Sequence, residues 1–171
     1  APVQIRERLH LSGTALPPFF ERLEQEGGIN ERLVLSTCNR VEVYAVTDNP
    51  EQAQVTIPRL LAEGTRTPLA LFEDRLYWHR HDAAVRHAFR VAASLDSLVL
   101  GESQILSQVK AAYEVARAQG VTGPILNTLM TRSLGVAKKV RTETGIGEAA
   151  VSIPSAAIGL AKTIFGELSG R

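Results

Sequence analysis

Cysteine is almost absent from this sequence, which holds a single one, Cys38, among 171 residues. One thiol cannot form a disulfide within the chain, so a cysteine-stapled scaffold is excluded. Zinc sites built on several cysteines are excluded too, and His79 and His81 supply only two of the three or four ligands that a tetrahedral site needs. We therefore predict no metal site, and we expect a cytoplasmic location, where a free thiol stays reduced.

Charge of one sign and long hydrophobic runs are also lacking. The chain has 19 Lys and Arg against 18 Asp and Glu, so its net charge of +1 neither demands nor excludes a nucleic-acid partner. Any RNA contact must come from local clustering. No apolar run approaches the roughly 20 residues that span a bilayer, and the N-terminus lacks the pattern of a signal peptide. We expect neither membrane contact nor secretion.

The hydrophobic pattern divides the chain into a mixed part and a helical part. The first part alternates between the helical and the strand period, and the second keeps the helical period throughout. The predicted elements are helices over 12–28 and 50–64, strands over 33–35, 41–46 and 76–79, and then helices over 82–93, 105–120, 125–145 and 152–165. This predicts an α+β subdomain over 1–82 that carries Cys38, a helical subdomain over 83–147, and a helix over 148–171 that leads onward.

Cys38 lies in a short polar run between two of the predicted strands. Free cysteine is commonly a small buried hydrophobe, and this is the structural interpretation of Cys38. Its neighbours favour a chemical one, because Thr37 and Asn39 offer hydrogen bonds and Arg40 brings a permanent positive charge. A nearby cation favours the thiolate, lowering a thiol pKa that starts near about 8.5, and the thiolate is the nucleophile.

Arg40 has two possible roles that spacing alone does not separate. Its planar guanidinium suits bidentate binding of a substrate carboxylate. Equally, it can form an ion pair with Glu42 or Glu31 of this chain.

The sequence resembles the glutamyl-tRNA reductases in two motifs. The first is Ser-Thr-Cys-Asn-Arg-Val-Glu at 36–42, and the second is the longer stretch at 95–110, which runs from Leu95 to Lys110. Residues 137–147 and the opening segment 1–7 are also similar to the family. The resemblance therefore covers the whole chain.

This resemblance implies the N-terminal catalytic domain of such an enzyme. Its fold would be α+β, with a small split βαβ or ferredoxin-like sheet and packed helices, followed by an antiparallel α-helical subdomain. The chain opens at what resembles the end of the family's first strand, so we expect that strand to be missing or truncated. The family's NADPH-binding domain and its dimerising C-terminal region would lie beyond residue 171, and the full-length enzyme is expected to be a homodimer.

The implied reaction has two stages and leads into tetrapyrrole synthesis. Cys38 would attack the aminoacyl ester of glutamyl-tRNA, release the tRNA and hold glutamate as a thioester. Hydride from NADPH would then convert the thioester to glutamate-1-semialdehyde.

Position by position, the resemblance assigns roles to residues of both motifs. Cys38 would be the nucleophile, and His87 a second catalytic residue that assists proton movement at the leaving ribose oxygen or holds the thioester carbonyl. Gln104 and Gln108 are four residues apart and would project from one helix face. The substrate-binding positions implied by the family are Thr37, Asn39, Arg40, Ser97, Glu102, Ser103, Gln104 and Gln108.

A glycine-rich stretch near the C-terminus has the wrong context for a nucleotide site. Residues 145–150 match G-x-G-x-x-A, but such a loop should follow a buried strand and open a helix, whereas the preceding residues are polar and helical. We therefore assign no cofactor-binding residue to this chain.

Two other functions compete with the enzyme interpretation. The first is a non-catalytic module that binds tRNA or a protein through the helical half, with a structural Cys38. The second, a thiol-dependent phosphatase, is disfavoured because a C-x5-R loop would need arginine at position 44, which is tyrosine.

Basic residues in the helical half predict salt-sensitive binding of glutamyl-tRNA. If they face the acceptor end, the affinity falls as the salt concentration rises, because each phosphate contact releases a counterion. A titration at increasing salt measures this, and an affinity that stays flat from low to high salt would instead indicate an ordinary solvated helix surface. The residues concerned are Arg86, Arg90, Lys110, Arg117, Arg132, Lys138, Lys139 and Arg141.

Overall fold

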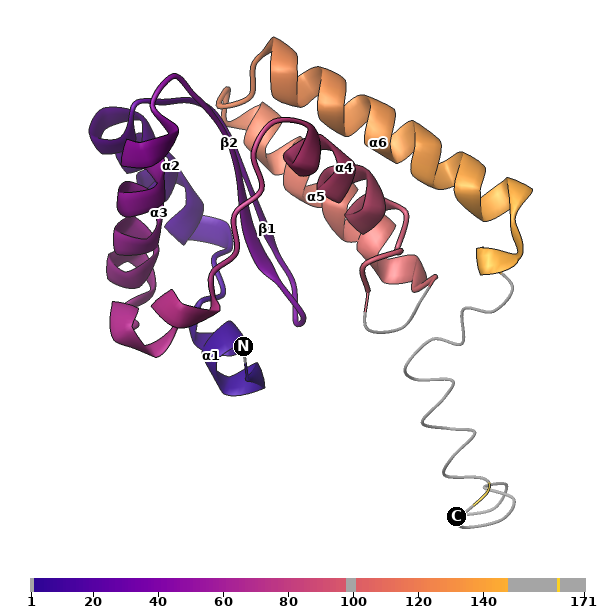
Figure 1. Cartoon of the computed structure of the whole chain (residues 1–171), viewed down its shortest axis with the longest axis horizontal. Helices are drawn as coiled ribbons and strands as arrows, with labels where there is room; N and C mark the ends of the chain where they lie inside the picture. The colour runs from indigo at the N-terminus through magenta and orange to yellow at the C-terminus, as the bar shows by residue number, and fades with distance from the viewer. Residues whose placement is uncertain (1, 98–100, 148–162, 164–171) are drawn as a thin grey trace.

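The computed structural model of the chain describes residues 2–97, 101–147 and 163. A short helix α1 (Val3–Arg8), which the sequence pattern did not predict, precedes three layers. Figure 1 shows helices α2 (Leu16–Gly27) and α3 (Pro50–Thr65) on one side of a β-hairpin, and α4 (Asp82–Ala92), α5 (Ser103–Ala118) and α6 (Pro124–Glu143) on the other. The hairpin is therefore the central layer, and its turn lies at one end of the molecule.

Strands β1 (Ile29–Ser36) and β2 (Val41–Thr47) pair antiparallel, with Val34 opposite Val43. Strand β2 is rich in β-branched side chains, which pack well on a pleated surface, and β1 contributes the apolar run 33–35. Leu33, Val34 and Leu35 are each at most 5% exposed. Since consecutive strand residues point to opposite faces, both faces of β1 are covered, and α2 and α5 are among the helices that contact it.

Helices α2 and α3 follow their sequence signals except at the start of α2. The Asn49 side chain accepts the N–H of Gln52 at 3.1 Å and caps α3, in agreement with the predicted start at residue 50. Gly28 adopts φ 59° and ends α2 in the left-handed conformation that glycine tolerates best. The predicted start at Ser12 is wrong, because a 3-10 turn (Gly13–Ala15) comes first and α2 begins at Leu16.

The helical half matches the predicted stripes. Helices α4, α5 and α6 confirm the helices expected over 82–93, 105–120 and 125–145, although Asp82 is the first residue of α4 and not its N-cap. Val109 of α5 and Met130 of α6 are buried in the same core. The helix expected over 152–165 lies outside the described residues except for residue 163. None of the helices in the described ranges is long and apolar enough to cross a bilayer.

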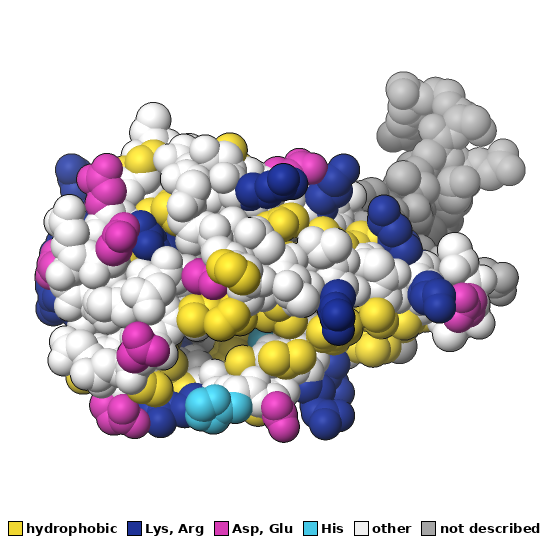
Figure 2. Space-filling view, turned by 90° about the horizontal axis from the view of Figure 1, so that it is seen from above, with side chains coloured by type: hydrophobic (Ala, Val, Ile, Leu, Met, Phe, Trp, Pro, Cys, Tyr) yellow, Lys and Arg dark blue, Asp and Glu magenta, His cyan; other side chains and the backbone are white. Residues whose placement is uncertain are grey.

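The predicted strand over 76–79 is wrong. This segment is extended but pairs with no strand, and an apolar groove of about 700 Å³ is lined by both it and β2. Figure 2 shows hydrophobic side chains gathered around a hollow in this part of the surface. An apolar run of four residues becomes a strand only when a neighbour takes its hydrogen bonds, and none lies beside it within 2–97 and 101–147.

The fold class is α+β with a small sheet, as predicted. The described residues contain a two-stranded antiparallel sheet, and β1 is the only strand that pairs with β2 there. A complete ferredoxin-like sheet would need further strands beside β2.

Glu31 of β1 joins the sheet to the helical half. Its carboxylate accepts the backbone N–H groups of Ile125 at 3.1 Å and Leu126 at 2.6 Å, in the first turn of α6. A negative charge is favourable there because it meets the positive end of the helix dipole. Gly123 lies so close that a Cβ on it would come within 2.5 Å of this carboxylate. The interaction therefore fixes where α6 begins relative to the sheet.

Replacing Glu31 with alanine should destabilise the protein. The change leaves two N–H groups at the start of α6 without their acceptor, and losing a helix cap costs about 1–2 kcal/mol of unfolding free energy. Urea unfolding followed by circular dichroism measures the change. The neighbouring exposed Asn30→Ala is the matched control, and equal effects of the two substitutions would contradict the capping role of Glu31.

Candidate active site

Cys38 is exposed in the turn of the hairpin. The N–H of Thr37 donates to the carbonyl of Arg40 at 2.8 Å and closes the turn. The Thr37 hydroxyl accepts the N–H groups of Asn39 and Arg40, each at 3.2 Å. Arg6 of α1 donates from Nε to the Cys38 carbonyl at 3.0 Å. The backbone is thus held while the thiol faces solvent, so the prediction of a turn position is confirmed and the buried-hydrophobe interpretation is wrong.

Glu42 of β2 is the centre of the polar network behind this turn. Its Oε1 accepts hydrogen bonds from Arg40 Nη1 at 2.8 Å and from the Tyr77 hydroxyl at 2.7 Å, and lies 3.0 Å from His87 Nε2. Its Oε2 accepts the Tyr44 hydroxyl at 2.7 Å. Four side chains therefore converge on one carboxylate that is only 6% exposed. Arg40 comes from the hairpin turn, Tyr44 from β2, Tyr77 from the extended segment before α4, and His87 from α4.

These contacts decide the charge of Glu42. Burial alone would raise the pKa of this carboxyl, but the hydrogen bonds from His87, Tyr77 and Tyr44 and the charge of Arg40 lower its pKa to about 2. Glu42 is therefore ionised throughout the physiological range. In turn, burial and the Glu42 charge raise the pKa of Tyr77, so its hydroxyl stays protonated and donates.

His87 is oriented by this carboxylate. An ionised Glu42 can only accept, so a neutral His87 must carry its proton on Nε2 and leave the lone pair on Nδ1. No described residue forms a hydrogen bond to Nδ1. The ring packs against His79 with centroids 4.6 Å apart and edge-on to Tyr77 at 5.7 Å. His87 therefore presents a basic nitrogen from a fixed ring.

An open pocket of about 370 Å³ adjoins the turn, lined by Asn39, Arg40, Tyr77, His79, His87 and Asp96. Arg40 Nη1 lies 3.3 Å from Asp96 Oδ2, and Nη2 also donates to the Asp96 carbonyl. The ion pair predicted between Arg40 and Glu42 is present, and the alternative partner Glu31 instead caps α6. Arg40 therefore brings its charge to the pocket wall while two acidic residues hold it in place.

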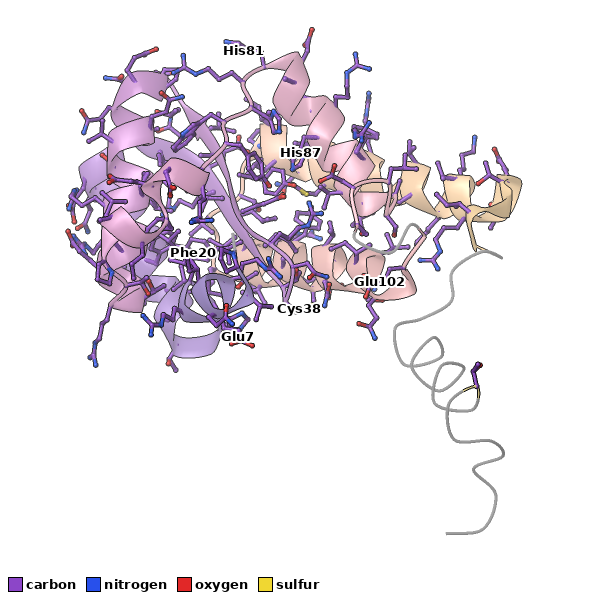
Figure 3. All side chains as sticks on the ribbon, turned by 60° about the horizontal axis from the view of Figure 1, so that its bottom comes forward. Glu7, Phe20, Cys38, His81, His87 and Glu102 are labelled. Atoms are coloured by element: carbon purple, nitrogen blue, oxygen red, sulfur yellow. The ribbon has the colours of Figure 1, made fainter. Side chains whose placement is uncertain are left out.

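The second motif surrounds the start of α5. Ser97 is half-buried before it, Glu102 is its N-cap residue, Ser103 is its first residue, and Gln104 and Gln108 follow. Figure 3 shows Cys38 at the hairpin tip and Glu102 at the start of α5 on the same side of the molecule, with His87 further along on α4. Ser97, Glu102, Gln104 and Gln108 do not line the pocket of Arg40 and His87.

Gly101 connects this motif to residues 145–147. It has φ 80°, and a Cβ on it would collide with the carbonyl oxygen of Ile146. Glycine is required here on both grounds, because other residues rarely adopt this φ and no side chain fits. The motif is thereby held against the 3-10 turn (Gly145–Gly147) that follows α6.

Comparison with known proteins agrees with this arrangement. The sequence model of the family described as glutamyl-tRNAGlu reductase, N-terminal domain, matches residues 1–144. The chain belongs to this family. This chain is 48% identical to the glutamyl-tRNA reductase of Rubrobacter xylanophilus and 46% identical to that of Pelobacter propionicus. Both matches cover the whole of this chain, and they cover 40% and 39% of the two relatives. The solved glutamyl-tRNA reductase from Methanopyrus kandleri matches with a TM-score of 0.74 and 33% identity, over 98% of this chain and 38% of that one.

The chain thus spans about two fifths of the length of its glutamyl-tRNA reductase relatives. The glycine-rich stretch that begins at Gly145 does not have the surroundings of a dinucleotide-binding loop. The element before Gly145 is the helix α6 and not a strand, which confirms that the G-x-G-x-x-A match lacks the required context. Within the same ranges, no three His, Cys, Asp or Glu side chains come together to hold a metal.

Sequence reasoning missed three residues of the pocket. Tyr77 and His79 lie in the segment that the sequence predicts to be a strand, and Asp96 lies in the second motif, where the resemblance implies no role for it. The sequence holds one signal for Glu42, which is the only charged residue in the mostly apolar run that forms β2. A buried charge in such a position requires partners, but the sequence does not say which.

Replacing Glu42 with glutamine should make stability less dependent on acid pH. The pKa of Glu42 is lowered in the folded state from 4.5 to about 2, so its contribution is complete above pH 4.5 and is lost as the pH falls toward 2. The shift corresponds to about 3 kcal/mol of unfolding free energy at pH 7. Urea unfolding at several pH values should show a gap between Glu42→Gln and the parent that narrows toward acid.

The exposed Glu73→Gln is the matched control and should follow the parent at every pH. A gap for Glu42→Gln that stays constant from neutral to acid pH would contradict the ionised state of Glu42.

Proposed function

We propose that this chain is the part of a glutamyl-tRNA reductase that takes the glutamyl group from tRNA onto Cys38. The observation that carries the proposal is the free, exposed thiol on a fixed turn whose next two residues, Asn39 and Arg40, line a charged pocket. A nucleophile must be accessible and held still. The thiol is exposed, and the contacts of Thr37 and Arg6 hold the backbone that carries it.

The acylation step is a transfer between two carbonyl derivatives. His87 Nδ1 would take the proton of the Cys38 thiol. The resulting thiolate would attack the ester carbonyl carbon, the C–S bond would form, the bond to the ribose oxygen would break, and His87 would return the proton to that leaving oxygen. Glu42 keeps the imidazole in the required tautomer and stabilises the imidazolium that forms in between.

Substrate binding would use both sides of the turn. Arg40 would bind the side-chain carboxylate of the glutamyl group with its guanidinium fork. Thr37 and Asn39 would keep the turn in the shape that surrounds the ester carbonyl of the substrate. The contacts at the start of α5 would come from Ser97, Glu102, Ser103, Gln104 and Gln108.

Reduction requires NADPH, which supplies the hydride that converts the thioester to glutamate-1-semialdehyde for tetrapyrrole synthesis. We propose that NADPH binds to, and dimerisation occurs through, parts of the enzyme outside these 171 residues, and that this chain alone stops at acylation or slowly hydrolyses the thioester. Its expected location is the cytoplasm.

The charge distribution supports tRNA binding through the helical half. Residues 83–147 hold eight Lys and Arg against four Asp and Glu, whereas residues 1–82 hold nine against twelve. Figure 2 shows dark-blue basic side chains spread along the side nearer the grey C-terminal residues. A positive surface of this kind attracts the phosphate backbone.

Incubation with glutamyl-tRNA tests the proposal directly. The parent protein should gain the mass of one glutamyl residue on Cys38, or release glutamate from the tRNA faster than buffer alone. Intact-mass analysis and an acid-precipitable count of charged tRNA measure the two outcomes. Cys38→Ser should abolish the adduct, and glutaminyl-tRNA, whose side chain lacks the charge for Arg40, should react more slowly.

A parent protein that forms no adduct and deacylates no faster than Cys38→Ser would reject the proposal. The remaining function would then be a non-catalytic module that binds tRNA or a protein.

A further inference from the structure

Asp96 is the one acidic residue among the six that line the pocket beside the turn. Glu42 lies behind the wall, 6% exposed, with both oxygens engaged by Arg40, Tyr77, His87 and Tyr44. The Asp96 side chain is 37% exposed. A ligand that enters the pocket therefore meets the Asp96 carboxylate and not that of Glu42.

The Asp96 carboxylate has hydrogen-bonding capacity left. Its Oδ2 lies 3.3 and 3.4 Å from the two Nη atoms of Arg40. Its Oδ1 lies 3.8 Å from Arg90 Nη2, which is beyond hydrogen-bond length. Each carboxylate oxygen accepts about two hydrogen bonds. Within the described ranges, Asp96 Oδ1 therefore has the charge of Arg90 nearby but accepts no hydrogen bond, and it can accept one from a ligand.

A glutamyl ester carries two opposite charges a few bonds apart. The side-chain carboxylate is negative, and the α-amino group, free in an aminoacyl ester, is positive when protonated. The pocket offers the complementary pair, because Arg40 and Asp96 are adjacent on its wall. A cation bound away from bulk water needs an anionic or strongly polar acceptor, and Asp96 is the acceptor with room for one.

We propose that Asp96 recognises the α-ammonium group of the glutamyl substrate while Arg40 binds its side-chain carboxylate. Asp96 is then a specificity-determining residue that also holds Arg40 in place. This inference rests on the proposed function, since it takes the pocket to be the glutamyl site. It does not depend on Cys38 being the nucleophile.

The test measures binding in a Cys38→Ala background, in which no acylation at position 38 consumes the ester. Glutamyl-tRNA is compared with its α-hydroxy analogue, in which a hydroxyl of similar size replaces the ammonium group. At about pH 6.5, below the usual α-amino pKa, the background protein should prefer glutamyl-tRNA about tenfold or more. Adding Asp96→Asn should reduce this preference to about threefold or less.

Asp74→Asn in the same background is the matched control, because Asp74 is exposed and pairs with the adjacent Arg75. It should leave the preference unchanged. Circular dichroism of each variant verifies that the fold is intact, and Asp96→Glu, which keeps the charge, should retain part of the preference.

Two results would overturn the inference. Equal affinity of the Cys38→Ala protein for glutamyl-tRNA and for its α-hydroxy analogue would show that the protein does not recognise the ammonium group. Asp96→Asn weakening both tRNAs by the same factor would show that Asp96 only positions Arg40. Either result is separate from failure of the acylation experiment, which reports on Cys38 and not on this preference.

Discussion

The site depends on the buried carboxylate of Glu42. This one group accepts hydrogen bonds from Arg40 in the hairpin turn, from Tyr44 on its own strand, from Tyr77 after α3 and from His87 on α4. Burying a charge is costly unless it is fully hydrogen-bonded, so the four donors and the acceptor hold one another in place. The network therefore sets the position of the Arg40 charge, the tautomer of His87 and the distance between the sheet and the helical half.

A second carboxylate, that of Glu31, also joins the sheet to the helical half, at the opposite end of the hairpin. Glu31 accepts the first N–H groups of α6, so β1 fixes the helix that packs against both α4 and α5. Helix α4 carries His87, and the turn after it carries Asp96. The placement of the pocket wall thus follows from two glutamates of the sheet, each of which ties a segment of the helical half to a strand.

Much of the fold follows from local signals. The apolar stripes that predicted α5 and α6, and the Asn49 cap of α3, are local because a helix satisfies its backbone hydrogen bonds internally. The segment 76–79 has the composition of a strand, but a strand needs a neighbour that the segment itself does not contain. The same reason explains why Tyr77 and His79 were expected in a sheet and instead line a pocket.

The sequence by itself determined the family, through the motifs at 36–42 and 95–110, and it determined that Cys38 lies between two strands. These are properties of consecutive residues. Only the tertiary structure decided which side chains meet Glu42, that Arg40 pairs with Glu42 and Asp96, and that Asp96 faces the pocket. Partners such as Glu42 and His87 are 45 positions apart, and only the packing of α4 beside the hairpin brings them together.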